Sequence, residues 1–160
     1  MINSIAEIVL EDVSEMVTKT LDTLEGQISS KQKEVLDIEM TAYLFWTLPT
    51  IGAFEGPLQR PVMDALHQAY FEHLKKIGCS HKVVQGVCDE FVKRYKTYDQ
   101  LLFSKDVEGS NNFLKVGLQF SKFVSEKSGV ESGIEILSVP PTLMNLARTK
   151  VEGYPKADTN

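Results

Sequence analysis

Residues 35–61 read VLDIEMTAYLFWTLPTIGAFEGPLQRP, and this stretch decides the fold. Its first half is apolar around most of a helical circumference, and Glu34, Asp37 and Thr41 form only a narrow polar strip. A helix with so little polar surface is typical of the centre of a bundle or of a subunit interface. We therefore predict a central helix over residues 31–47.

Proline and glycine interrupt the second half of this stretch, although it retains large apolar side chains. Pro49 disfavours helical geometry at the residue before it, so the central helix is predicted to end at about residue 48. The next helix is predicted to start near Pro61, because the fixed φ of proline suits a first helical turn. A connection of about a dozen residues would exceed the roughly two to eight usual between helices. Its apolar side chains, which we expect to pack on neighbouring helices or on a second subunit, are Leu48, Ile51, Phe54 and Leu58.

Apolar residues recur every three to four positions along most of the remaining chain, which predicts further helices. These helices are expected at residues 4–28, 61–77, 81–102, 112–127 and 142–151. We predict an all-α, single-domain bundle of five or six helices over residues 1–152, followed by a frayed tail at residues 153–160.

Residues that cap or break helices mark the predicted boundaries. Ser29 or Ser30, and Ser80 further on, can accept a hydrogen bond from an unpaired N–H at the start of a helix. Gly78 follows two lysines, a pattern typical of a helix C terminus. The polar segment 104–112 is predicted to be a loop. Residues 134–139 fit either a short strand or a helical turn, and the two prolines that follow are expected to break the chain.

Composition and charge exclude some functions. The 160 residues are 42% hydrophobic and 24% charged, which is ordinary for one globular domain. The net charge of −5 argues against a general nucleic-acid binder, which needs a basic surface. Residues 1–58 carry ten acidic residues against three lysines. This acidic half is either a solvated face or a surface that docks a basic partner, as in an immunity or antitoxin protein.

The two cysteines, Cys79 and Cys88, are too few for a disulfide framework and are expected to be free thiols. The N-terminal residues have no basic flank and no unbroken apolar run, so they do not resemble a signal peptide. No stretch approaches the ~18 apolar residues of a membrane span. We therefore expect a cytoplasmic protein that neither spans nor binds a membrane.

Glu39 is a single carboxylate within the apolar arc of the central helix. Burying a charged carboxylate is costly unless it is paired or protonated. One interpretation is a structural ion pair between helices. The other is a general acid/base or ligand anchor, for which we expect Arg60, His67 or His73 as the partner. Arg60 itself precedes a helix, where it can help to bind an anion or pack its stem on an aromatic side chain.

The sequence gives only weak support to a metal site or to a nucleophilic cysteine. The string His73-x5-Cys79-x-His81-x6-Cys88 has only one close pair of ligands, whereas zinc sites usually have two. The same Cys79 and His81 make a weak nucleophile pair, because working pairs are usually distant in sequence. A di-iron bundle needs two carboxylate-x-x-His pairs, and only residues 64–67 fit loosely. We predict no metal and no cofactor.

The sequence lacks a phosphate-binding loop and a serine nucleophile elbow, which favours a role other than catalysis. The leading interpretation is a small cytoplasmic helical module that binds another protein or a second copy of itself. The alternative is a ligand-binding protein or small enzyme with an apolar pocket between the helices of residues 31–47 and 61–77. The aromatic stripe of the helix at residues 81–102 would line such a pocket, or simply belong to the core. The candidate binding residues are Glu39, Trp46, Phe54, Arg60 and His67.

Overall fold

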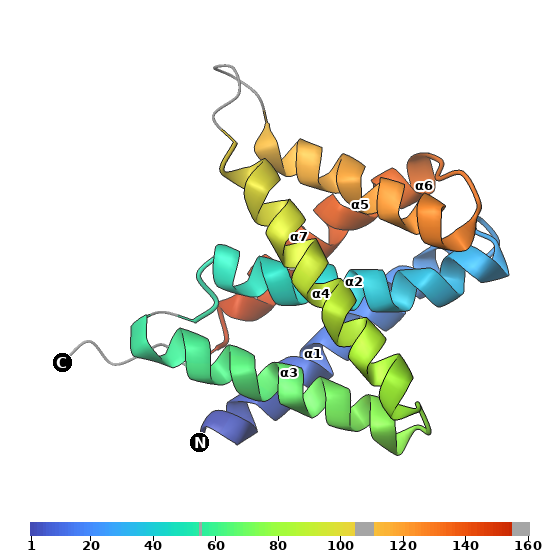
Figure 1. The fold of residues 1–160 in the computed structure, drawn as a ribbon. Helices are drawn as coiled ribbons and strands as arrows, with labels where there is room; N and C mark the ends of the chain where they lie inside the picture. Colours follow the sequence, from blue (N-terminus) through green and yellow to red (C-terminus); the bar gives the residue numbers. More distant parts are fainter. Residues whose placement is uncertain (55, 105–110, 155–160) are drawn as a thin grey trace.

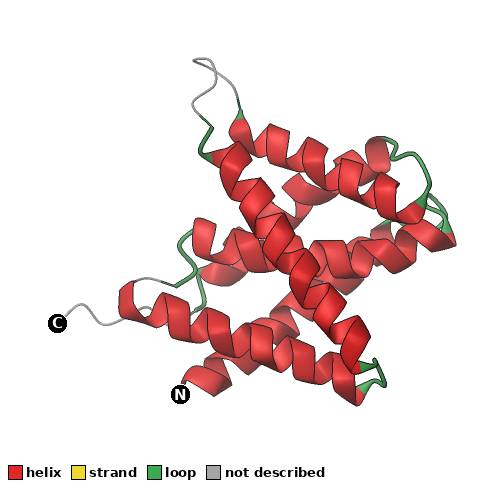
Figure 2. Ribbon diagram, viewed as in Figure 1, coloured by secondary structure: helices red, strands yellow, loops and turns green. Residues whose placement is uncertain are grey.

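The computed structural model describes residues 1–54, 56–104 and 111–154 (Figure 1). All regular structure in this part of the chain is helical (Figure 2), so the predicted all-α bundle is confirmed. The helices are α1 (Ile2–Thr23), α2 (Ser30–Thr50), the 3-10 helix η1 (Gly56–Leu58), α3 (Gln59–Lys76), α4 (His81–Leu102), α5 (Asn112–Ser128), α6 (Ile134–Leu137) and α7 (Val139–Val151).

Helix α2 is the centre of the fold, as its sequence predicts. Every side chain of residues 41–48 is buried, because α1, α4, α5 and α7 all pack against α2. Helix α1 pairs with α3, and α4 runs diagonally across α2 to reach α5 (Figure 1). The long helices therefore bury α2 from several sides and leave its C-terminal end at the edge of the bundle.

The predicted end of this central helix at residue 48 is wrong, because α2 continues through Pro49 to Thr50. Pro49 lacks the N–H that would bond to the carbonyl of residue 45, and because it lies in the last turn the helix loses this bond near its end and not in its middle. The hydroxyls of Thr47 and Thr50 donate to the carbonyl oxygens of residues 43 and 46, both at 2.8 Å. Such bonds from hydroxyl to carbonyl are formed locally in helices.

The connection that follows α2 is shorter than predicted. Helix η1 starts at Gly56, and α3 begins at Gln59, two residues before Pro61. The amide of Ala53 donates to the carbonyl of Leu48 at 2.9 Å, and Gly52 takes a φ of 75° that turns the chain back. Because of this turn, Ala53 and Phe54 are buried against the same chain.

Helix boundaries elsewhere follow the capping residues. Ser29 forms a reciprocal capping box with Gln32, and Ser80 accepts a hydrogen bond from the amide of Val83, as predicted. Helix α1 ends at Thr23, earlier than the predicted residue 28, and Gly26 turns the chain with a φ of 77°. Glycine readily adopts this left-handed conformation.

Residues 134–151 are helical, which decides between the two structures we considered for residues 134–139. They form the single turn α6 and the start of α7. The prediction that Pro140 and Pro141 break the chain is wrong, because they lie in the first turn of α7. Proline suits that position, where its missing N–H would have no helical partner.

The end of the described chain is packed on the bundle. Tyr154, which we assigned to the frayed tail, is buried, and its ring stacks on Phe54 with 5.7 Å between centroids. The rest of that predicted tail, residues 155–160, lies outside the described residues, as do residues 105–110 of the predicted loop.

Candidate functional site

A groove opens at the edge of the bundle, between the C-terminal end of α2 and the helices α3, α4 and α5. Its volume is about 930 Å³. We call it the α2–α5 groove, and its walls are Phe45, Trp46, Pro49, Thr50, Gly56, Gln59, Arg60, Met63, His67, Tyr95, Asp99, Leu102, Phe103 and Phe113. The groove is wide enough for several side chains of a ligand and is lined mainly by apolar and aromatic groups. These are the usual properties of a binding site.

Trp46 forms the floor of the groove. Its side chain is only 4% exposed, which confirms the prediction that it is buried. The indole Nε1–H donates to Oδ1 of Asp99 at 2.8 Å, and the ring packs against Tyr98 with 5.2 Å between centroids. The indole is therefore held in one orientation by both its polar and its apolar edges.

His67 and Tyr95 form a hydrogen-bonded pair on the groove wall. The His67 Nδ1 lies 2.6 Å from the carbonyl oxygen of Met63, and its Nε2 lies 2.7 Å from the Tyr95 hydroxyl. A carbonyl only accepts, so Nδ1 carries the proton and Nε2 accepts from the tyrosine. Burial lowers the pKa of His67 and raises that of Tyr95, which favours the neutral forms of both groups.

The two charged groups of the groove differ in their partners. Arg60 stands on the rim with its side chain 91% exposed and pairs with Asp64 at 3.8 Å. Asp99 is exposed on the facing helix and accepts the bond from Trp46. In the described part of the chain, no lysine, arginine or histidine lies within ion-pair distance of Asp99. Its negative charge is therefore not balanced by a direct partner.

Glu39 lies away from this groove, in a buried ion pair with Arg94. Two hydrogen bonds join the carboxylate to the guanidinium, at 2.7 and 2.8 Å. The two side chains are only 3% and 6% exposed. The interpretation as a structural ion pair between helices is confirmed, and the expected partners Arg60, His67 and His73 are wrong. The reason is that α4 packs on α2 and brings in an arginine from 55 positions along the chain.

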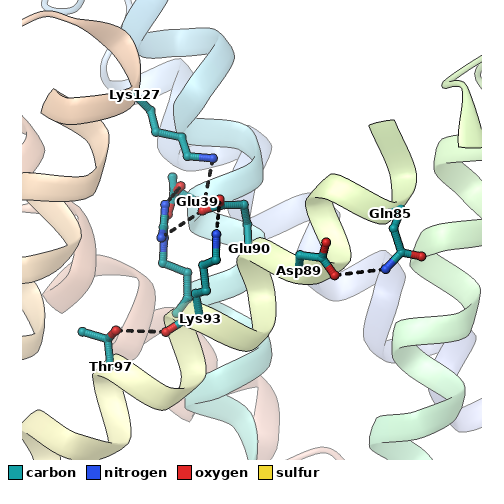
Figure 3. Close-up of polar contacts among 8 residues, drawn as sticks. Glu39, Gln85, Asp89, Glu90, Lys93, Thr97 and Lys127 are labelled. Carbon is teal, nitrogen blue, oxygen red and sulfur yellow. Dashed lines mark hydrogen bonds and ion pairs between the residues drawn. The ribbon is translucent and has the colours of Figure 1, made fainter. Parts of the chain in front are cut away.

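Further contacts complete this buried cluster. The Arg94 guanidinium lies over the ring of Phe123, 3.6 Å from its centroid. Glu90 also pairs with Arg94 at 3.1 Å and receives Lys127 of α5 at 3.2 Å. Figure 3 shows Lys127 and Lys93 converging on Glu90 beside Glu39. Both oxygens of Glu39 accept hydrogen bonds from Arg94, so this carboxylate links α2 to α4.

The structure therefore brings together three of the five candidate residues, Trp46, Arg60 and His67. Phe54 is buried against Tyr154 and is not part of the groove wall. Sequence analysis missed Asp99. Its only signal is its position on α4, four residues after Tyr95 and next to the aromatic stripe of that helix. Its role depends on a contact with Trp46, 53 positions away, which no local pattern reveals.

A second hollow of about 370 Å³ lies between α1, α2 and α3. Apolar side chains such as Val17, Tyr70 and Leu74 line it, and Glu7 and Glu11 stand among its polar residues. Unlike the α2–α5 groove, it contains none of the five candidate residues.

Within the described residues, no three His, Cys, Asp or Glu side chains come together to form a metal site. Cys79 and Cys88 are both free thiols. None of the described helices combines the length and apolar character needed to cross a bilayer. The chain matches no protein-family model, and no curated protein or solved structure is significantly similar to it.

Proposed function

We propose that this protein is a protein-binding module whose α2–α5 groove receives a short segment of a partner protein. One observation carries the proposal: an aromatic groove lies open at the edge of the bundle, with Phe103 on the rim 75% exposed. Exposed aromatic side chains beside a concave apolar surface are typical of sites where a partner inserts an anchor residue.

The open rim favours a protein segment over an enclosed small molecule. Arg60 and Phe103 stand in solvent on either side of the groove. A chain can therefore pass across it while one or two of its side chains enter. The floor is already ordered, because Trp46 is held by Asp99 and Tyr98. Preorganisation of this kind lowers the entropy cost of binding.

The polar groups support a binding role more than a catalytic one. His67 uses both ring nitrogens in hydrogen bonds, and Glu39 uses both oxygens on Arg94. A general base needs a free lone pair within reach of a substrate. The Nε2 lone pair of His67 already accepts from Tyr95, and Glu39 is buried away from the groove, so neither residue offers a free lone pair to a ligand there.

The partner that we propose is a different protein. The predicted route to a homodimer relied on an exposed loop around Phe54, and that side chain is buried in its own chain. We place the interaction in the cytoplasm, and the two free cysteines support a reducing compartment.

Selection of random peptides displayed on phage against the purified protein tests this proposal. Trp46 is the single tryptophan, so its fluorescence reports directly on the groove. We expect selected peptides to change this fluorescence. We also expect Phe103→Ala to weaken their binding about tenfold, a typical effect for an anchor contact.

The control variant is Val92→Ala, which removes an exposed apolar side chain from α4, the helix that Phe103 follows, outside the groove. It should leave the affinity unchanged. The proposal fails if no peptide is enriched, or if the selected peptides bind Phe103→Ala as tightly as the parent protein. A dimer of the protein alone that Phe103→Ala dissociates would identify a second copy as the occupant and overturn the choice of a different partner.

A further inference from the structure

We infer that the partner segment presents a cationic side chain, lysine or arginine, which is bound between Asp99 and the aromatic rings of the α2–α5 groove. This inference rests on the proposed function and names the chemistry that the groove recognises.

Asp99 is oriented for this contact. Its Oδ1 is fixed by the hydrogen bond from the Trp46 indole at 2.8 Å, which sets the plane of the carboxylate against the groove floor. The residue is exposed, and no partner is found for its second oxygen among the described residues. A carboxylate held on one side and open on the other can accept a charge-assisted hydrogen bond from a ligand.

The charge of the groove favours a cation. Arg60, the other charged group of the wall, is paired with Asp64 on its own helix. His67 is favoured in its neutral form, because its ring is buried and its Nε2 accepts from Tyr95. Lys96 lies on the same helix as Asp99 and is exposed, but the two do not form an ion pair. Among the described residues of the groove, a ligand therefore meets one negative charge without a direct partner, which attracts a cation and repels an anion.

The aromatic rings supply the second half of the site. Phe103 follows Asp99 by one turn, with its amide bonded to the Asp99 carbonyl, and Phe113 lies against the Trp46 floor with 6.5 Å between ring centroids. A cation over an aromatic face is stabilised by the ring quadrupole, and the effect is larger where water is partly excluded. The alkyl stem of lysine or arginine can also cover apolar surface while its head remains at the carboxylate.

In the core of the same protein, a carboxylate, a cation and an aromatic ring are already in contact with one another. Arg94 is held by the carboxylate of Glu39 and lies over the ring of Phe123 at 3.6 Å. The groove presents the carboxylate and the rings without the cation. The partner would supply the group that Arg94 supplies in the core.

Three small probes of similar size test the inference: benzylammonium, which donates N–H bonds as lysine does, benzyl alcohol and benzoate. Binding is followed by the NMR signal of the Trp46 indole N–H, which donates to Asp99. We expect the cation to bind about tenfold more tightly than the neutral alcohol or the anion, in the range of partly desolvated cation–π contacts. Salt should reduce this preference, because the site is near the surface.

The decisive variant is Asp99→Asn, which keeps an acceptor oxygen for Trp46 and removes the charge. It should reduce the preference for the cation to less than about twofold. Asp89→Asn is the matched control, because Asp89 is exposed on the same helix and bonds only to Gln85. It should leave the preference unchanged.

The other outcomes separate the two proposals. Equal binding of the cation and the alcohol at the groove overturns the inference, while the apolar groove of the proposed function remains. A preference for the cation that persists in Asp99→Asn, or that shifts signals of the hollow between α1 and α3 instead, also overturns it. If no probe binds but selected peptides do, the cationic anchor is wrong and the binding module stands. If neither binds, both are wrong.

Discussion

Two carboxylates of this protein, Glu39 and Asp99, lie beside aromatic rings, and they differ in their bonding partners and in their exposure. Glu39 has both oxygens bonded to Arg94, whose other face is covered by Phe123, and the whole arrangement is buried. Asp99 has one oxygen bonded to Trp46 and lies exposed at the groove. Similar chemistry joins two helices at Glu39, and we propose that it forms a binding site at Asp99.

The two carboxylates are expected to contribute differently to the stability of the fold. A buried pair is stabilising only while both partners are present, because a single charge left in the core is strongly unfavourable. An exposed carboxylate loses little when its charge is removed. Stability should therefore depend on Glu39, and ligand recognition on Asp99.

The largest effect is expected from Glu39→Gln. The variant leaves the Arg94 charge buried, with Glu90 as its remaining carboxylate. We expect a loss of about 3 kcal/mol in the free energy of unfolding, measured by urea denaturation. Glu34→Gln, an exposed change on the same helix, should cost less than about 0.5 kcal/mol. Equal losses of free energy of unfolding in the two variants would contradict a stabilising role of the Glu39–Arg94 ion pair.

A smaller effect is expected from Trp46→Phe, which removes the indole N–H and keeps an aromatic ring on the groove floor. The lost bond to Asp99 and the reduced packing should together cost about 1–2 kcal/mol in the free energy of unfolding. The same measurement on Trp46→Phe combined with Asp99→Ala, which removes the acceptor, should show non-additive losses, since the two side chains share one hydrogen bond. Strict additivity would mean that this bond contributes nothing.

A pH dependence is the third expectation. Burial lowers the pKa of His67 from its usual value of 6.5, so the unfolded chain takes up a proton at a higher pH than the folded chain. The contribution of His67 to stability should be fully present above pH 6.5 and decrease as the pH falls below that value. Unfolding curves at several pH values should show this decrease, and His67→Gln should lack it. A variant with the same pH profile as the parent would rule out His67 as the cause.

The parts of the fold that depend on local sequence patterns could be predicted, and those that depend on distant contacts could not. The helices and the caps at Ser29 and Ser80 follow from periodicity and from side chains that bond to nearby backbone. The continuation of α2 through Pro49 did not follow, because the burial of Leu48 in the core outweighs the preference of a residue before proline for extended geometry. Phe54 was misplaced because its cover, Tyr154, is distant in the sequence.

The candidate site was predictable only in part, for the same reason. Trp46, Arg60 and His67 lie near the junction of α2 and α3, so one apolar segment and its surroundings point to all three. The roles of Glu39 and Asp99 depend on contacts with residues 55 and 53 positions away. Sequence could identify the unusual carboxylate in the core, but it could not name Arg94 as its partner or find Asp99.

The central claim is that the buried carboxylate of Glu39 stabilises the fold and the exposed carboxylate of Asp99 binds a cation. The most direct test measures both properties in one variant, Asp99→Asn, by urea denaturation and by titration with benzylammonium and benzyl alcohol. We predict a change of less than about 0.5 kcal/mol in the free energy of unfolding and loss of the roughly tenfold preference for the cation. A variant that is destabilised as strongly as Glu39→Gln, or that keeps the preference, would contradict the account.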